Sequence, residues 1–309
     1  MINMVYNPNP YKQRQHEIFY VGGGRNPPTM LSAFSGETLE AAFKVRREDI
    51  EKVFRRQDNG TFQFLSEQER RKIMDGDDIQ RPSFTPLRSR RAESEEEYSK
   101  PFNMKKKEAK YSNENGWHIE AGCDDFRPLG RQEDRNSMGI SYTIIKPGKM
   151  TVPYWNTHST KISVVLRGRG RIEIASPEGV TEQWRGDRSG ESESEREKQK
   201  EGEEFRVSYR RVEDNLKVGD VFVIPAGYPS VQIANSNEGF EFMSFHTNFD
   251  RNDDYFVAGK NSLLNELQAE LLAKDFDVEK KEELKKLIGS QEKEVFVDGP
   301  KASQRWSIL

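Results

Sequence analysis

The side chains best suited to chemistry are few in this chain and lie far apart. The only imidazole and thiol groups belong to His16, His118, His158, His246 and Cys123. The histidines have no spacing typical of a metal site, and a single cysteine excludes a cysteine-rich zinc site and a disulfide within the chain. We therefore predict structural roles for these histidines. No Gly-x-Ser-x-Gly segment is present either, which disfavours a serine hydrolase.

Two segments of the chain place glycine and proline at regular intervals around polar side chains. In the first, Gly148 is followed after five residues by Tyr154-Trp155-Asn156, and then by Lys161 and Gly168. In the second, Gly219 is followed after five residues by Pro225-Ala226-Gly227, and then by Ser230. Glycine and proline at such positions are typical of tight turns between strands.

This frame resembles the two sequence motifs of the cupin family, which implies a jelly-roll β-barrel. In active cupins, the positions equivalent to Tyr154, Asn156, Lys161 and Ser230 hold two histidines, a glutamate and a third histidine. Imidazole and carboxylate groups donate lone pairs to a divalent metal, whereas the ammonium of Lys161 repels it. We therefore predict no metal, no cofactor and no catalytic residue. The alternative, a cupin oxidase or decarboxylase, requires His and Glu where this chain has neither.

The elements around this frame are predicted from hydrophobic periodicity. Short strands separated by glycine and proline turns are expected between Ser137 and Phe249: 141–145, 161–166, 171–174, 221–224, 231–233 and 240–245. Apolar residues at three- and four-residue spacing predict helices over 35–57, 261–275 and 279–290. Ser35 is a candidate cap for the first helix, and a break is expected near Val45. The predicted fold is mainly β, with helical arms attached to the barrel.

An internal repeat links the two helical regions. Phe19-Tyr20-Val21-Gly22-Gly23 resembles Tyr255-Phe256-Val257-Ala258-Gly259, and each segment precedes a pair of helical stripes. The two copies lie about 235 residues apart and stay in register through Phe43 and Phe276. A barrel precedes only the second copy in this sequence. We therefore expect the remnant of a two-barrel protein, whose first barrel is missing either naturally or because the start of the sequence is wrong.

Composition sets the domain boundaries. Of the 309 residues, 33% are hydrophobic and 33% charged, so packed segments should alternate with solvated ones. We predict four regions: the end of the first cupin unit with its arm (1–80), a charged linker (81–110), a barrel (111–250) and a C-terminal arm and tail (251–309). The acidic stretch 182–204 contains almost no apolar residue and is predicted to be a disordered loop within the barrel.

Within the cupins, the chain resembles vicilin-type (7S) seed globulins, of the cereal globulin kind. The matching stretches are Phe19 to Gly24, Tyr154 to Lys161, Gly219 to Gly227, Phe256 to Gly259 and the Pro101-Phe102-Asn103 entry to the barrel. The resemblance implies a nutrient reservoir in the seed storage vacuole, mobilised by proteolysis on germination. It also implies self-association, as a homotrimer if a full first barrel is present. No secretory signal is readable in 1–10.

Other functions are weighed against this one. A net charge of −3 gives no reason to expect nucleic acid, and the Arg-rich turn at 167–171 is predicted to be a charged turn between strands. No 18-residue apolar run predicts a membrane span. A vicilin-like protein that binds a small molecule or carbohydrate at Tyr154, Trp155 and Tyr228 is one alternative, and a non-functional truncated remnant is another. Asn59-Gly60-Thr61 is the only N-glycosylation sequon, so Asn59 is a possible glycosylation site.

Overall fold

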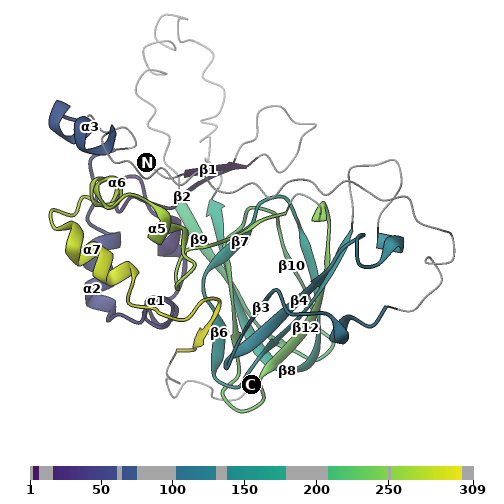
Figure 1. The fold of residues 1–309 in the computed structure, drawn as a ribbon. Helices are drawn as coiled ribbons and strands as arrows, with labels where there is room; N and C mark the ends of the chain where they lie inside the picture. The colour runs from purple at the N-terminus through teal and green to yellow at the C-terminus, as the bar shows by residue number, and fades with distance from the viewer. Residues whose placement is uncertain are drawn as a thin grey trace, which may run out of the picture.

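The computed structural model describes residues 3–6, 17–60, 65–74, 102–129, 138–178, 208–249 and 252–300. Within them, an antiparallel β-barrel carries its α-helices on one side (Figure 1). The strands are β1 (Asn3–Tyr6), β2 (Glu17–Tyr20), β3 (Tyr111–Asn113), β4 (Gly116–Ala121), β5 (Gly139–Ile145), β6 (Lys149–Thr151), β7 (Tyr154–Asn156), β8 (Lys161–Glu178), β9 (Ser208–Lys217), β10 (Val221–Ile224), β11 (Ser230–Ala234), β12 (Phe240–His246), β13 (Asp254–Phe256) and β14 (Phe296–Asp298). This is the mainly β barrel that the sequence predicts.

The long strand β8 belongs to both walls of the barrel. Its first part pairs with β10 and β12, and the order β10-β8-β12-β5-β4-β3 forms what we call the first sheet. Its second part pairs with β9 and β11, and β11 continues to β6 and β7, with β14 and β13 outside them. These strands form the second sheet. The separate strands predicted at 161–166 and 171–174 are therefore two parts of one strand.

Gly148, Gly219 and Gly227 of the predicted frame occupy turns, whereas Gly168 lies inside β8. The predicted charged turn at 167–171 is therefore wrong, since these residues continue the strand. All four glycines adopt a backbone conformation that other residues adopt poorly. Gly148, Gly168, Gly219 and Gly227 have φ angles of 68°, 74°, 90° and 80°. At Gly168 a side chain would also collide with the neighbouring strand, because a Cβ atom there would lie 2.3 Å from the carbonyl oxygen of Gly239. The frame therefore fixes the barrel turns, as predicted.

The helices form two arms. The first arm contains η1 (Met30–Ala33), α1 (Gly36–Phe43) and α2 (Arg47–Phe54), and the second contains α5 (Leu263–Glu266), α6 (Ala269–Asp275) and α7 (Lys281–Ile288). The remaining helices are α3 (Glu67–Met74), η3 (Met104–Lys106) and η4 (Arg127–Leu129). Ser35 caps α1 as predicted, because its hydroxyl accepts a 3.1 Å hydrogen bond from the Thr38 amide. The predicted break follows at Lys44, whose φ is 55°.

The two arms pack against each other as repeated units. Phe54 of the first arm lies between Phe43 and Phe276, with ring centroids 5.3 and 5.2 Å away. The landmark glycines Gly23 and Gly259, which the repeat aligns, both have positive φ angles, 105° and 87°. The repeat predicted from the sequence is therefore a structural repeat, and its copies share one apolar contact.

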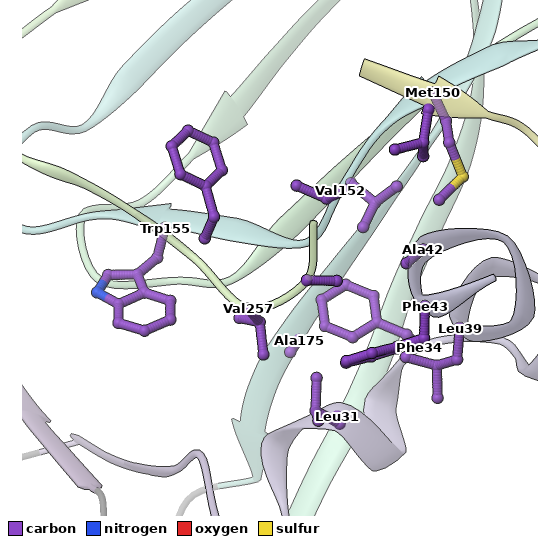
Figure 2. Packing of buried hydrophobic residues seen from close by; sticks show 14 of the residues in the cluster. Leu31, Phe34, Leu39, Ala42, Phe43, Met150, Val152, Trp155, Ala175 and Val257 are labelled. Carbon is purple, nitrogen blue, oxygen red and sulfur yellow. The ribbon is translucent and has the colours of Figure 1, made fainter. Parts of the chain in front are cut away.

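The arms cover the outer side of the second sheet. Figure 2 shows side chains of η1 and α1, among them Leu31, Leu39 and Phe43, gathered against Val152 and Ala175 of the barrel. These residues belong to one buried cluster that continues into the barrel. Arm and barrel therefore share a hydrophobic core.

The predicted domain limits are only partly covered by the described residues. The acidic stretch 182–204 lies outside them, as does most of the predicted linker 81–110. The end of that linker, 102–110, differs from the prediction: η3 lies against β4, and Lys110 binds carboxylates of the barrel. The carboxylates of Glu120 and Asp254 bind the Lys110 ammonium, and a contact between such distant residues cannot be predicted from composition. Within the described ranges, no helix has both the length and the hydrophobicity needed to cross a bilayer.

Candidate functional site in the barrel interior

The four residues at the cupin ligand positions lie close together in the structure, but they bind other protein groups. Tyr154 and Asn156 are on β7, Lys161 begins β8, and Ser230 begins β11, where it pairs with Tyr154. The Lys161 ammonium donates to the Tyr154 hydroxyl at 3.4 Å and lies 4.9 Å from the centroid of its ring. The frame therefore brings Tyr154 and Lys161 into direct contact.

The other two positions are occupied differently. The Asn156 amide donates to a carboxylate oxygen of Asp254 on β13. The Ser230 hydroxyl accepts a 3.1 Å hydrogen bond from the Gln232 side chain. Asn156 and Ser230 are both buried, so these contacts satisfy polar groups that would otherwise be costly to bury.

Lys161 is one end of a chain of alternating charges, which we call the charge chain. Its ammonium lies 3.9 Å from Asp254 Oδ1, and the Lys110 ammonium bridges Asp254 Oδ2 and Glu120 Oε2 at 2.7 Å each. Glu120 Oε1 then lies 2.9 Å from His118 Nε2. The side chains of Lys161 and Asp254 are only 3% and 2% exposed, so solvent screens this end of the chain little.

Burial and neighbouring charges compete in setting the protonation of this chain. Burial alone would lower the pKa of Lys161, but electrostatic interactions with the Tyr154 hydroxyl and with the carboxylates of Asp254 and Glu120 raise it above its usual value. The same competition raises the pKa of Lys110, where Asp254 and Glu120 outweigh burial. Burial would raise the pKa of Glu120, but hydrogen bonding to His118 and the charges around it hold that pKa well below its usual value. Both lysines are therefore cationic and Glu120 is ionised at neutral pH.

These charges fix the tautomer of His118. Since Glu120 is ionised and can only accept, His118 Nε2 must carry the proton of their contact. His118 Nδ1, 2.7 Å from Thr143 Oγ1, then accepts from that hydroxyl if the ring is neutral.

A second polar cluster lies next to the charge chain, on the inner face of β5, β8 and β12. His246 Nε2 lies 2.7 Å from the Ser141 hydroxyl, and the hydroxyls of Ser163 and Ser244 are 2.8 Å apart. His246 is fully buried, and burial, with the nearby charge of Lys161, lowers its pKa well below the usual value. Its ring is therefore neutral.

The metal that the fold family implies does not fit these residues. Lys161 places a positive charge where a carboxylate ligand belongs, and its amine remains protonated. Across the described ranges, no three His, Cys, Asp or Glu side chains are arranged to hold a metal ion. The interior can hold charges in fixed positions, but Lys161, the only strong base at the four positions, is already protonated.

The free space next to the charge chain is small. A cavity of about 20 Å³ is lined by Tyr111, His118, Thr143, Thr151, Tyr154, Lys161, Asp254, Phe256, Val295 and Phe296. A cavity of this size holds about one water molecule. Of the three aromatic residues predicted for a ligand site, only Tyr154 lines it. Trp155 instead stacks on Tyr255 at 5.5 Å, and Tyr228 packs edge-on against Phe19 at 5.3 Å.

Sequence reasoning missed most of the charge chain. The alternation over 116–121 was a usable signal for His118 and Glu120, since Trp117, Ile119 and Ala121 occupy the opposite face of β4. Asp254 and Lys110 had no such signal, because they lie outside the strands that the periodicity identifies.

Comparison with known proteins agrees with this fold. The sequence profile of the family described as Cupin matches residues 102–284. Vicilin Pis v 3.0101 of Pistacia vera is 33% identical over 289 residues, which cover 94% of this chain and 48% of that protein. Globulin-1 S allele of Zea mays is 30% identical over 305 residues, covering 94% and 50%.

Solved structures give the same result. The crystal structure of vicilin from Corylus avellana matches with a TM-score of 0.53 and 29% identity, covering 94% of this chain and 67% of that one. The chain spans about half the length of the curated relatives it matches. This chain therefore belongs to the cupin family, and its relatives within that family include vicilins and the globulin of Zea mays.

Proposed function

We propose that this protein is a seed storage globulin, a nutrient reservoir without catalytic activity. The observation that carries the proposal is the state of the four ligand positions: Tyr154, Asn156, Lys161 and Ser230 all contact other protein groups, and Lys161 is a cation. Similarity to vicilins over 94% of the chain supports the same conclusion. The function of a storage protein is to supply amino acids in large amounts to the growing seedling.

We propose proteolysis on germination as the route by which this store is released. The acidic stretch 182–204 supports this proposal through its composition, since small and polar residues are typical of the loop tips that proteases nick. Delivery to the storage vacuole and assembly into a homotrimer of two-barrel protomers are proposals drawn from the vicilin resemblance. Asn59 is exposed in a turn, which supports its use for glycosylation in a secretory route.

The test is an immunoblot of dry seeds and of seedlings from the plant that encodes the chain. Storage predicts an abundant band in dry seeds that disappears during germination. A band absent from seeds at every stage would contradict storage and favour a non-functional remnant. Sensitivity of the band to an endoglycosidase, lost in Asn59→Gln, tests the glycosylation proposal.

Absence of catalysis has its own measurement. Purified protein is expected to contain far less than one equivalent of any transition metal, by elemental analysis, and to turn over no small organic acid. Stoichiometric tightly bound metal together with turnover would contradict the proposal.

Binding of a small molecule or carbohydrate is the less supported alternative. The cavity of about 20 Å³ holds a water molecule but no sugar ring. A true ligand at 100 times its dissociation constant would stabilise the protein by about 2.7 kcal/mol. A panel of sugars that leaves the melting temperature unchanged is therefore the expected outcome.

A further inference from the structure

The chain contains two asparagines that are directly followed by glycine, in the pairs Asn59-Gly60 and Asn115-Gly116. Such a pair is prone to deamidation, in which the glycine nitrogen attacks the amide carbon of the asparagine side chain. The attack is little hindered, because glycine carries no Cβ atom beside its nitrogen. The two pairs share this chemistry, so only the fold can make one of them react and protect the other.

The barrel holds the pair Asn115-Gly116 in place. Asn115 is 2% exposed, and its side-chain amide donates to the Phe296 carbonyl at 3.2 Å. Gly116 begins β4, where a Cβ atom would lie 2.5 Å from the Ile144 carbonyl oxygen. A ring that joins the Asn115 side chain to the Gly116 nitrogen would need this filled space and would disturb the pairing of β3 with β4. The fold therefore protects Asn115.

The pair Asn59-Gly60 lies at the surface, after the end of α2. Asn59 is exposed, and Gly60 has a φ angle of 83°. Among the described residues, a Cβ atom at Gly60 would meet no other atom within 4 Å. This leaves room for the ring and for the water that later opens it.

One contact opposes the reaction at this pair. The Gly60 amide donates to the Asn26 carbonyl at 3.1 Å, and this bond must open before the nitrogen can attack. A surface turn opens at a much lower free-energy cost than a core strand. The bond to Asn26 therefore slows the reaction at Asn59, whereas opening of the barrel would be needed at Asn115.

From this contrast we propose that Asn59 is a site of spontaneous deamidation in the folded protein and that Asn115 is not. The Gly60 nitrogen loses its proton and bonds to Asn59 Cγ, the bond from Cγ to Nδ2 breaks, and Nδ2 leaves as ammonia. Water then adds to either carbonyl of the resulting succinimide ring, and the ring opens to aspartate or isoaspartate. One water is consumed for each ammonia released. The proposal does not rest on the storage function.

Deamidation changes the contacts of this turn. Gln57 Oε1 accepts from the Asn59 amide at 3.0 Å, and the Gln57 carbonyl accepts from the Arg25 and Asn26 amides at 2.7 and 3.2 Å. Isoaspartate adds one methylene group to the main chain between the amides of residues 59 and 60, which are both anchored here. It should therefore loosen the contact of this turn with Arg25 and Asn26. The released nitrogen is also the atom that would carry a glycan, so a deamidated chain cannot be glycosylated at this position.

The test is incubation of the intact, unglycosylated 309-residue chain, in neutral buffer and in parallel in concentrated urea. Mass spectrometry of tryptic peptides follows the conversion of the Asn59 and Asn115 amides to carboxyl groups. In urea the two sites should convert at similar rates, because the fold no longer distinguishes them. In neutral buffer Asn59 should convert at least about tenfold faster than Asn115. The isoaspartate fraction should also show faster hydrogen exchange at Arg25 and Asn26.

Asn59→Gln is the matched control, since a glutamine would have to close a larger ring and its amide should persist. Gly60→Ala places a methyl group beside the attacking nitrogen and should slow conversion at Asn59, in urea as well as in buffer. Melting curves show whether each variant folds, and the urea measurement does not depend on folding. Equal rates at Asn59 and Asn115 in the folded protein would overturn the proposal. An Asn59 amide that persists in buffer after both sites have converted in urea would overturn it as well.

Discussion

At the residue scale, Lys161 occupies a position where an active cupin carries a carboxylate ligand. Its ammonium lies between the Tyr154 ring and the Asp254 carboxylate, and 3% of its side chain is exposed. A buried charge is tolerated when its partners offset the loss of hydration, and here the partners belong to a chain that continues through Lys110 to Glu120. Lys161 thus belongs to an internal network of charges at a position where the cupin resemblance predicts a metal ligand.

Removing this charge should destabilise the barrel. Lys161→Met keeps the length of the side chain but leaves Asp254 with one cation fewer, so we expect a loss of about 3 kcal/mol in the free energy of unfolding. Urea denaturation measures the change. Lys52→Met removes a lysine whose side chain is 74% exposed, and it should have no measurable effect. Adding Asp254→Asn to Lys161→Met should recover part of the loss, whereas a wild-type-like Lys161→Met would show that the pair contributes nothing.

His246 makes stability depend on pH. Its folded pKa lies well below the usual 6.5, so the unfolded chain takes up a proton at pH values where the folded protein does not. The free energy of unfolding should therefore fall as pH drops below 6.5, by up to about 1.4 kcal/mol per pH unit from this residue. Glu120 affects a different pH range. Because the folded protein lowers the pKa of Glu120, its contribution to stability is lost only as the pH falls below 4.5, the usual pKa of a glutamate.

The substitution His246→Gln tests whether His246 causes this pH dependence of the free energy of unfolding. His246→Gln can keep a hydrogen bond to Ser141 without titrating, so the slope between pH 6.5 and about 5 should flatten. Asn59 is exposed and its side chain does not titrate, so Asn59→Gln should leave the slope unchanged. An equal slope in His246→Gln and wild type would assign the pH dependence to other groups.

At the element scale, a buried carboxylate adds a polar contact between the first arm and the barrel, beside their shared apolar core. Glu173 of β8 accepts hydrogen bonds of 2.9 Å from the Ser35 amide and the Thr38 hydroxyl at the start of α1. Arg171 lies 3.0 Å from the same carboxylate. Negative charge near a helix N-terminus is favourable, and this carboxylate also satisfies an amide that α1 itself leaves without a partner.

Glu173→Ala should loosen the first arm. It removes the acceptor for Ser35 and Thr38 and leaves Arg171 without its carboxylate, so we expect a loss of about 3 kcal/mol in the free energy of unfolding. Hydrogen exchange should rise over α1 and α2 while β12 stays protected. Glu213 pairs with Glu173 across the strands, and its own side chain is 44% exposed. Glu213→Ala should therefore change neither the free energy of unfolding nor the hydrogen exchange of the arm. Uniform exchange across arm and barrel in Glu173→Ala would contradict a local role.

At the scale of the whole molecule, arms and barrel share one core. Phe19 of the first unit lies between Tyr209 and Tyr228 of the barrel, with ring centroids 6.0 and 5.3 Å away. The Tyr209 hydroxyl accepts from the Tyr20 amide at 2.6 Å and donates to the Ile18 carbonyl at 3.0 Å. Separate domains exchange few such contacts, whereas here aromatic rings and buried hydrogen bonds join the units.

Unfolding should therefore be one cooperative transition. Far-ultraviolet circular dichroism reports mainly on the helical arms. Of the four tryptophans, Trp117 and Trp155 lie in the barrel, so their fluorescence reports on it once Trp184 and Trp306 are replaced by phenylalanine. The two signals should have the same midpoint in urea. An earlier midpoint for the helical signal would show that the arms unfold independently and would contradict a shared core.

The sequence by itself determined the local features of this protein. Glycine adopts positive φ at the lowest cost, so Gly148, Gly219 and Gly227 were readable as turns of the barrel frame, whereas Gly168 lies inside strand β8. Helices and strands with one apolar face could be predicted from the spacing of their hydrophobic residues. The repeat could be predicted from the similarity of residues 19–23 to residues 255–259. The assignment of Tyr154, Asn156, Lys161 and Ser230 to the cupin ligand positions rests only on their spacing from that frame and stays a prediction.

Only the tertiary structure decided which side chains meet. Asp254 binds the ammonium of Lys110, which lies 144 residues away in a segment predicted to be a linker. Asp254 also contacts Lys161. The tertiary structure also decided that Trp155 and Tyr228 pack on other aromatic rings and do not line the cavity. Whether an apolar strand face is covered by an arm or left open was likewise settled by packing. The physical reason is that local backbone preference acts over a few residues, whereas the partner of a charge or an apolar face is set by strand register between distant segments.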